Sequence, residues 1–307
     1  DIVIVTYNSE KWIKRCLDSL LKAKALSSDL KLIFVDNHSS DQTVELLTAY
    51  KKKYDFSRFE IIQQEQNQGF GNANNLGASF GKDEIVCFLN VDTEVFEDTL
   101  TAEEIIAESS KEIGAWEFRQ LPYEHPKIYD PVTGITSWMS GAAFAVRREI
   151  FEKLQGFDKN IFMYAEDVDF SWRLRASDYK IKYCPTVKIM HYSYESIGAV
   201  KPAQYVNSLI NNLLLRYRFG SFSDVPGTAG NTFMRWHYEP YGHSGDPEIA
   251  VVTNTIPNTG ITLPFISYGG TSEGCTGGKI TAATFAAEDA AAVSYCTIAV
   301  GTAHAAV

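Results

Sequence analysis

The sequence has 307 residues, 45% of them hydrophobic, which is enough to bury the core of one large α/β domain or of two smaller domains. Its net charge of -10 argues against a broad surface for a phosphate backbone, so nucleic acid is not an expected partner. No stretch reaches the roughly 20 consecutive apolar residues of a membrane-spanning helix, and the first residues given lack the basic-then-apolar pattern of a secretion signal. Because Asp1 runs directly into strand-like residues without a starting Met, we expect a chain trimmed at its front.

The cysteines indicate the cellular compartment. Their number is five, which is odd, and none of them stands in Cys-x-x-Cys spacing. This pattern favours a reducing compartment over a disulfide framework or a zinc site. We therefore expect a cytoplasmic protein.

Strand-like and helical patterns alternate through the first part of the chain. Apolar runs predict strands over residues 2–6, 31–36, 59–64 and 84–90. Helices are predicted between them, where apolar residues recur from Ile13 to Leu21, after a cap at Ser39 or Ser40, and from Asn74 to Phe80. Strands that alternate with helices imply right-handed crossovers and a mostly parallel central sheet flanked by helices, so the predicted fold class is α/β.

The carboxyl ends of these strands are where such a sheet binds ligands. All four ends are polar: Thr6-Tyr7-Asn8, Asp36-Asn37, the loop 67–75, and Asn90-Val91-Asp92. Ordinary helix capping explains any single end equally well. Four polar ends together, two of them with carboxylates, favour a ligand site.

The second part of the chain has longer elements and an unusual tail. We expect a strand running into a helix over 138–151, a loop over 156–164, a helix over 165–177, a strand over 179–192 and a helix from Pro202 to about Arg218. Beyond Ser223 the composition changes, because only two of the 28 Lys and Arg residues lie in 223–307. We predict one domain over 1–222 and a C-terminal segment over 223–307 that is either β-rich or poorly ordered.

Asn90-x-Asp92 follows a strand that reads as buried. Mg²⁺ and Mn²⁺ take oxygen ligands, and Mg²⁺ is commonly held by one or two carboxylates together with substrate phosphates. Asp92 is therefore a candidate metal ligand, although an Asn-x-Asp turn without a ligand is the simpler explanation of the tripeptide alone. His191, at the end of a later strand, is a candidate metal or diphosphate contact, with a structural role as the alternative.

Three carboxylates, Glu166, Asp167 and Asp169, crowd the start of a predicted helix. The helix dipole favours negative charge at that end, which is a sufficient structural reason for two of them. Neighbouring carboxylates also raise one another's proton affinity, which is the tuning that a general base needs near neutral pH. One of the three is a candidate base.

The stretch QNQGFGNANN, residues 66–75, combines glycines with asparagines. Gly69 and Gly71 allow close backbone approach, and Asn74 and Asn75 can donate hydrogen bonds to ligand oxygens. The stretch matches neither the Walker pattern nor the dinucleotide glycine pattern, so it supports neither a P-loop enzyme nor a dehydrogenase.

The motifs VTYNS, FVDNHSSDQT, NQGFGNANN, FLNVDT, SGAAFAVRREIF, FMYAEDVDFSWRLR and MHYSYES stand in one order along the chain. This ordered set closely resembles the bacterial family 2 glycosyltransferases, in their rhamnosyltransferase-like branch with the GT-A fold, over about residues 1–222. The resemblance implies inverting transfer of a sugar from a nucleoside diphosphate donor to a glycan or lipid-linked acceptor in cell-surface polysaccharide synthesis. It further implies a divalent metal, Mg²⁺ or Mn²⁺, and the branch suggests dTDP-rhamnose as the donor.

The resemblance also implies roles for individual residues, with Asp167 as the catalytic base. Nucleotide and donor contacts fall on Thr6, Tyr7, Asn8, Asp36, Gly69, Asn74, Asn75 and Asn90. Acceptor or sugar contacts fall on Trp138, Glu166, Trp172 and Arg173, and metal contacts on Asp92 and His191. Asn90 replaces the first Asp of the family's Asp-x-Asp motif, and a neutral amide is a weaker ligand, so we expect Asn90 to act through water.

Two other functions are weighed against this one. A nucleotide-sugar-binding or scaffold protein without turnover would explain the weakened metal motif and the unfamiliar tail. A nucleotidyltransferase shares the general sheet but normally uses a glycine-rich, basic N-terminal loop, which VTYNSEKW is not. A lipid-linked acceptor would bring a cytoplasmic enzyme to the inner face of the membrane by peripheral association.

Overall fold

The computed structural model describes residues 1–23, 30–54, 58–96, 101–122, 124, 128–192, 202–219, 234–240 and 247–253. Its contacts divide the chain into two compact units. The first unit comprises Asp1–Gly230 with Asn258–Ser267, and the second comprises Asn231–Pro257 with Tyr268–Val307. All candidate site residues belong to the first unit.

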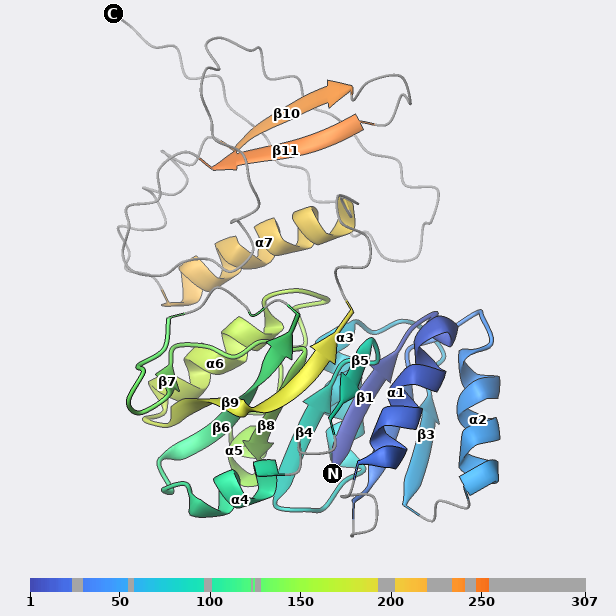
Figure 1. Ribbon diagram of the computed structural model, residues 1–307. Helices are drawn as coiled ribbons and strands as arrows, with labels where there is room; N and C mark the ends of the chain where they lie inside the picture. Colours follow the sequence, from blue (N-terminus) through green and yellow to red (C-terminus); the bar gives the residue numbers. More distant parts are fainter. Residues whose placement is uncertain are drawn as a thin grey trace, which may run out of the picture. The chain divides into compact units, whose positions relative to one another are not determined.

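The first unit is built on a nine-stranded sheet (Figure 1). One half is parallel, in the order β3-β2-β1-β4, and consists of β1 (Ile2–Thr6), β2 (Leu32–Asp36), β3 (Phe59–Gln63) and β4 (Ile85–Leu89). The other half is mixed and continues through β8 (Ala143–Arg147), β6 (Ile113–Leu121), β9 (Lys180–His191) and β5 (Thr93–Val95), with β7 (Ile135–Thr136) paired to β9. The parallel half therefore aligns four strand ends at one edge.

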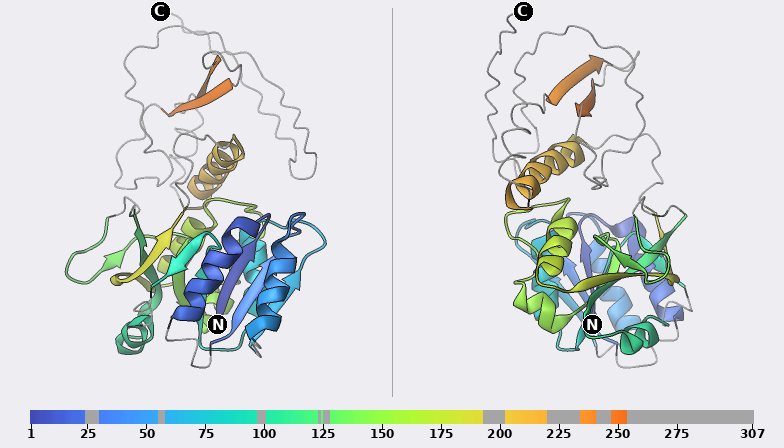
Figure 2. Two further views of the ribbon diagram at one scale, coloured as in Figure 1. Left: turned by 45° about the vertical axis from the view of Figure 1, so that its right-hand side comes forward. Right: turned by 90° about the vertical axis from the view of Figure 1, so that its left-hand side faces the viewer.

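Helices cover both faces of the sheet (Figure 2). Alternate side chains of a strand point to opposite faces, so Ile4 packs in one core cluster and Val3 in the other. The Ile4 cluster takes in α1 (Glu10–Lys22) and α2 (Thr43–Tyr54), while the Val3 cluster takes in α3 (Phe70–Ser79), α5 (Arg148–Lys153) and α6 (Glu166–Ala176). α4 (Thr101–Glu108) and α7 (Pro202–Phe219) complete the helices of this unit that the structure describes. The predicted α/β class, with a mostly parallel sheet flanked by helices, is confirmed.

The elements expected from the sequence are confirmed in order, with differences at two helix starts. α2 begins at Thr43 rather than after Ser39 or Ser40, because both serines bind groups of the strand-end loops instead of capping the helix. α3 begins at Phe70, ahead of the expected Asn74. The residue before it, Gly69, has a positive φ of 86°, a backbone conformation that glycine adopts easily and that allows the helix to start here. β5, β6, β7 and α4 were not predicted.

The second unit contributes one described hairpin. β10 (Met234–Pro240) pairs with β11 (Pro247–Thr253) in antiparallel fashion, with Met234 opposite Thr253. The rest of the segment 223–307 lies outside the described residues, so the expectation of a separate β-rich or poorly ordered tail stays a prediction.

Two further sequence features have a counterpart in the structure. Among the described residues, Cys16, Cys87 and Cys184 are free thiols, while Cys275 and Cys296 lie outside them. None of the helices that the structure describes is both long and apolar enough to cross a bilayer.

Candidate active site at the strand ends

Thr6 and Asp36 end adjacent parallel strands and lie opposite each other in register. The Thr6 hydroxyl donates to Asp36 Oδ1 at 3.0 Å, the Ser39 hydroxyl donates to the same oxygen at 2.5 Å, and the Ser39 amide donates to Oδ2 at 2.9 Å. Thr6 and Asp36 are almost completely buried. The Asp36 carboxylate is thus fixed in one orientation at the strand end.

Tyr7 and Asn8, which directly follow β1, are exposed and form the lip of the site, that is, its solvent-facing edge. Asn8 has a left-handed backbone, with φ of 47°, and its amide donates to Ser39 Oγ at 2.9 Å. Its side-chain oxygen accepts from the Ser40 amide at 2.8 Å, so the loops after β1 and β2 are tied together. The Tyr7 side chain is 51% exposed beside them and presents an aromatic ring to solvent.

Asn37 connects the end of β2 to the loop before α3, a role that sequence reasoning did not assign. Its Oδ1 accepts from Gln64 Nε2 and from the Gln68 amide, both at 2.8 Å, and its Nδ2 donates to Asn67 Oδ1 at 2.8 Å. Asn37 is buried. The quoted motif contains this residue, but nothing in the sequence shows which loop its amide holds.

Because Gly69 has no side chain, the backbone of Phe162 can approach it closely. A Cβ at this position would lie 2.2 Å from the Phe162 carbonyl oxygen, and φ is +86°. The Phe70 amide donates to that same carbonyl at 2.8 Å. The loop 156–164 is therefore held directly against the start of α3.

Asn74 and Asn75 bind the protein itself. Asn74 is 1% exposed and its Nδ2 donates to the Phe70 carbonyl at 3.1 Å. The Asn75 amide makes a reciprocal pair with the Phe157 backbone, with both bonds at 2.8 Å. The Asn75 contacts hold the 156–164 loop in place, whereas Asn74 binds within α3.

Asp92 and His191 come together through the antiparallel pairing of β5 with β9, in which Thr93 lies opposite His191. His191 Nε2 is 3.4 Å from Asp92 Oδ1, and the side chains are 11% and 23% exposed. His191 Nδ1 lies 2.8 Å from Gln120 Oε1. The Asn90 side-chain oxygen nearby in sequence is buried and has no hydrogen-bond partner.

The donor set at Asp92 and His191 fits a divalent cation. In the part of the chain that the structure describes, no group of three or more His, Cys, Asp or Glu residues could hold a metal ion. A carboxylate and an imidazole would therefore leave several coordination positions to ligand oxygens and water, as is usual for Mg²⁺.

Glu166 and Asp167 are buried together at the start of α6, with 6% and 7% exposure. Asp167 Oδ2 accepts the Gly141 amide at 2.8 Å. Burial, and next the charge of Asp167, raise the pKa of Glu166 to about 8, and its Oε2 has no hydrogen-bond partner. Near neutral pH this arrangement favours the protonated form of Glu166.

Asp169, the third acid, has a structural role. It is completely buried and is bound by Arg173 Nε at 2.7 Å and by Arg218 Nη1 at 2.8 Å. Arg218 also forms an ion pair with Asp158. A buried carboxylate with two cations is neutralised in place.

The turn before β8 links the two halves of the site. The Asn90 amide donates to the Ala142 carbonyl at 2.9 Å, so this turn is fixed to the end of β4. One residue earlier, the Gly141 amide binds Asp167. The Asn90-x-Asp92 end and the Asp167 carboxylate are therefore connected through two consecutive residues.

Trp138, Trp172 and Arg173 make their contacts within the protein. Trp138 is 6% exposed and packs with Ala165 in a small apolar cluster against α7. The Trp172 ring meets Phe219 edge-on, with centroids 5.3 Å apart. Arg173 donates through Nη1 and Nη2 to the Leu154 and Gly156 carbonyls, both at 2.7 Å, in addition to Asp169.

α7 supports the acid-bearing segment from a distant part of the chain. Asn211 Nδ2 donates to the carbonyls of Met163 and Tyr164 at 2.9 and 2.7 Å. Tyr164 and Ala165 both have positive φ, 68° and 71°, directly before Glu166. Such a pair of left-handed residues is strained, and α7 provides part of what holds it. The sequence predicted this helix but no role for it.

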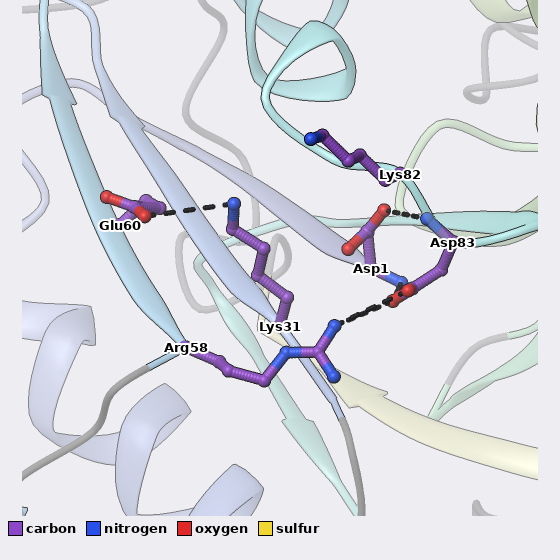
Figure 3. A pocket seen from close by; sticks show the side chains of 6 residues that line it. All are labelled: Asp1, Lys31, Arg58, Glu60, Lys82 and Asp83. Atoms are coloured by element: carbon purple, nitrogen blue, oxygen red, sulfur yellow. Dashed lines mark hydrogen bonds and ion pairs between the residues drawn. The ribbon is translucent and has the colours of Figure 1, made fainter.

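A pocket at the opposite edge of the sheet is not part of this site. It is lined by Asp1, Lys31, Arg58, Glu60, Lys82 and Asp83 (Figure 3). These residues lie at the amino ends of the strands: Glu60 is the second residue of β3, and the other five precede β1 to β4. Their charges pair locally, Arg58 with Asp83 at 3.4 Å and Lys31 with Glu60 at 3.7 Å.

Known proteins with this sequence pattern and fold are glycosyltransferases. The family model described as glycosyl transferase family 2 matches residues 1–155. The rhamnosyltransferase WbbL of Escherichia coli is 25% identical over 229 residues, which cover 63% of this chain and 83% of WbbL. The O-antigen chain rhamnosyltransferase RfbN of Salmonella typhimurium is 28% identical over 211 residues, covering 62% of this chain and 65% of RfbN.

A solved structure shows the same fold. The mannosyltransferase PcManGT from Pyrobaculum calidifontis, in complex with GDP-Man and Mn²⁺, superimposes with a TM-score of 0.58 at 19% identity, over 72% of this chain and 64% of that chain. This likeness identifies the α/β architecture described above as the GT-A fold. With the family match over half of its length, the chain belongs to glycosyl transferase family 2 and is a transferase enzyme of that family.

Proposed function

We propose that this protein is an inverting glycosyltransferase that moves a sugar from a nucleoside diphosphate donor to a hydroxyl group of a glycan or lipid-linked acceptor. The observation that carries the proposal is the convergence at one edge of the sheet. There the Asp92–His191 pair and the buried Asp167 carboxylate are connected through Gly141 and Ala142. Domain limits of about 1–222 for this activity, with a separate segment 223–307, are part of the proposal.

The nucleotide binds at the ends of β1 and β2. Asp36, oriented by Thr6 and Ser39, presents acceptor oxygens to the N–H and O–H groups of a base or ribose, and the exposed Tyr7 ring offers a stacking face. Asn8 shapes the lip through Ser39 and Ser40. Gly69 and Asn75 hold the 156–164 loop against α3, and together with Asn74 on α3 they line the proposed donor pocket.

Asp92 and His191 hold the divalent cation, Mg²⁺ or Mn²⁺, with Asn90 acting through water. When bound, the cation supplies positive charge to the departing diphosphate. The solved mannosyltransferase that shares the fold is in complex with GDP-Man and Mn²⁺, which supports a cation in this role.

Asp167 acts as the base. It takes the proton from the acceptor hydroxyl, whose oxygen attacks the anomeric carbon as the bond from that carbon to the diphosphate oxygen breaks. Glu166, whose pKa is raised by burial and next by the Asp167 charge, can when protonated donate a hydrogen bond to a sugar hydroxyl. Trp138, Trp172 and Arg173, which also bind neighbouring parts of the protein, remain the proposed contacts for the acceptor or the donor sugar.

The names of the relatives support a donor and a product for the proposed reaction. WbbL and RfbN are both named rhamnosyltransferases, which supports dTDP-rhamnose as the donor and cell-surface polysaccharide as the product. The cytoplasmic side of the membrane, where a lipid-linked acceptor is reached, is the proposed location.

A nucleotide-sugar screen and one variant test this function. A thermal-shift screen with Mn²⁺ should find one donor that stabilises the protein, by about 2.7 kcal/mol at 100 times its dissociation constant, and a chelator should remove the effect. Asp167→Asn should reduce transfer by about 10²–10⁴-fold or more with donor binding retained. Asp178→Asn is the matched control, since Asp178 is exposed and its left-handed backbone suits Asn.

The outcomes separate this function from a scaffold. Donor binding without transfer in the wild-type protein, for any acceptor tried, would favour the nucleotide-sugar-binding alternative. Loss of folding in Asp167→Asn, with Asp178→Asn intact, would assign Asp167 a structural role.

A further inference from the structure

Gln120 lies against the proposed metal pair and has no role in the mechanism above. It stands near the end of β6, which runs parallel to β9 with Gln120 in register with Ile189, two residues before His191. The side chain is 3% exposed. Sequence reasoning did not find it, because 71 positions separate Gln120 from His191 and β6 was not predicted.

The side-chain oxygen of Gln120 has a hydrogen-bond partner, whereas its side-chain nitrogen has none. Its Oε1 lies 2.8 Å from His191 Nδ1, within hydrogen-bond distance. Its Nε2 is buried and has no hydrogen-bond partner. Leaving a buried donor unpaired is unfavourable, so the orientation that places Oε1 on the imidazole needs a reason.

The tautomer of His191 supplies that reason. A neutral imidazole has one N–H donor and one acceptor nitrogen. Because Gln120 Oε1 can only accept, Nδ1 carries the proton, and in the neutral ring Nε2 then presents a lone pair. Nε2 lies 3.4 Å from Asp92 Oδ1, which is also an acceptor. Two acceptors at this distance oppose each other unless a proton or a metal cation lies between them.

The reversed amide would produce a different site. With Nε2 of Gln120 donating to Nδ1, His191 would carry its proton on Nε2 and donate it to Asp92. The pair would then be satisfied by its own hydrogen bond, and a cation would have to displace that proton before it could bind. The orientation of one buried amide therefore decides whether the two side chains form a closed pair or an open pair of ligands.

We propose that Gln120 is a positioning residue that holds His191 in the Nδ1–H tautomer through Oε1, so that Nε2 is presented with Asp92 to a divalent cation. The proposal rests on the function proposed above, in that it takes Asp92 and His191 as the metal ligands. Partners of this kind, which bind the far nitrogen of a ligating histidine, typically contribute 10–100-fold to metal affinity.

Two readouts test the proposal, the tautomer of His191 without metal and the affinity for Mn²⁺. Gln120→Met keeps a similar volume but removes the acceptor, whereas Gln120→Glu keeps an acceptor for Nδ1–H. The tautomer is read from the ring-nitrogen NMR shifts of His191, and Mn²⁺ binding from titration followed by electron paramagnetic resonance. Gln42→Met, on exposed Gln42, is the matched control, and circular dichroism verifies folding of each variant.

The expected result has three parts. Gln120→Met should shift His191 toward the Nε2–H tautomer and weaken Mn²⁺ binding by about 10–100-fold, Gln120→Glu should retain the wild-type tautomer and bind Mn²⁺, and Gln42→Met should match the wild type. Wild-type tautomer and wild-type Mn²⁺ affinity in a folded Gln120→Met protein would overturn the role of Gln120 alone. Mn²⁺ binding that is absent from the wild type, or unchanged in Asp92→Asn, would instead overturn the metal site itself and the proposal with it.

Discussion

Replacing Glu166 by Gln should change how the stability of the protein depends on pH. Glu166 is buried next to Asp167, and burial followed by the Asp167 charge raises its pKa from 4.5 to about 8. At about 1.36 kcal/mol per pKa unit, ionising Glu166 in the folded protein costs several kcal/mol, with about 5 kcal/mol as the ceiling. Gln has nearly the same shape and cannot ionise, so the variant avoids this cost.

The direction of the effect follows from the protons bound in each state. In the unfolded chain Glu166 loses its proton near pH 4.5, whereas the folded protein keeps it until about pH 8. Between these values the unfolded state binds fewer protons, so Glu166 lowers the free energy of unfolding as the pH rises, and the loss is complete above about pH 8. Glu166→Gln should therefore gain stability relative to the wild type across this window.

Urea unfolding of both proteins at about pH 5 and about pH 8.5 measures the effect. The difference in free energy of unfolding between Glu166→Gln and the wild type should increase by several kcal/mol from the lower to the higher pH, while Asp178→Asn should follow the wild type. Parallel pH profiles for Glu166→Gln and the wild type would refute the reasoning, because they would mean that Glu166 ionises alike in both states.

Three further substitutions test contacts that shape the site, each through the free energy of unfolding in urea. Gly69→Ala should cost at least about 2 kcal/mol, since it places a Cβ 2.2 Å from the Phe162 oxygen at positive φ; an unchanged midpoint would contradict this. Arg218→Met should cost about 3 kcal/mol by removing a cation from buried Asp169, more than Arg216→Met on the same helix; equal effects would count against the ion pairs. Thr6→Val should cost about 1 kcal/mol and weaken donor binding, because it removes the donor to Asp36; unaltered donor affinity would separate Thr6 from the nucleotide site.

Much of the parallel half of the sheet could be predicted from the sequence, because its signals are local. The apolar runs at 2–6 and 84–90 and the apolar spacing from Ile13 to Leu21 correspond to β1, β4 and α1. These elements bury their side chains in the two core clusters, which is what hydrophobic patterns report.

The starts of α2 and α3 were misplaced for a physical reason. A serine near a helix start looks like a cap, but Ser39 is drawn to the Asp36 carboxylate, which belongs to the preceding strand end. α3 begins directly after Gly69, whose positive φ and missing side chain let the Phe162 carbonyl approach and accept from the Phe70 amide. In both places a contact within the folded site overrides the local preference.

The residues that support the site could not be predicted. Gln120 meets His191 across 71 positions, and Asn211 meets Met163 across 48. Neither side chain belongs to a recognisable motif, and a hydrogen bond between distant segments leaves no periodic signal in the sequence. Motif residues indicate the chemistry expected of the site. The residues that orient them, Gln120 on β6 and Asn211 on α7, can be identified only from the folded structure.

The position of α7 bears on where this protein can be shortened. A version ending after β9 would keep the whole stretch matched by the family model and all candidate donor and metal residues. It would lose Asn211, which binds the carbonyls of the two residues before Ala165, and Arg218, which neutralises Asp158 and Asp169. The smallest fragment with an ordered base is thus expected to extend to Phe219, well past Gln155, where the match to the family model ends.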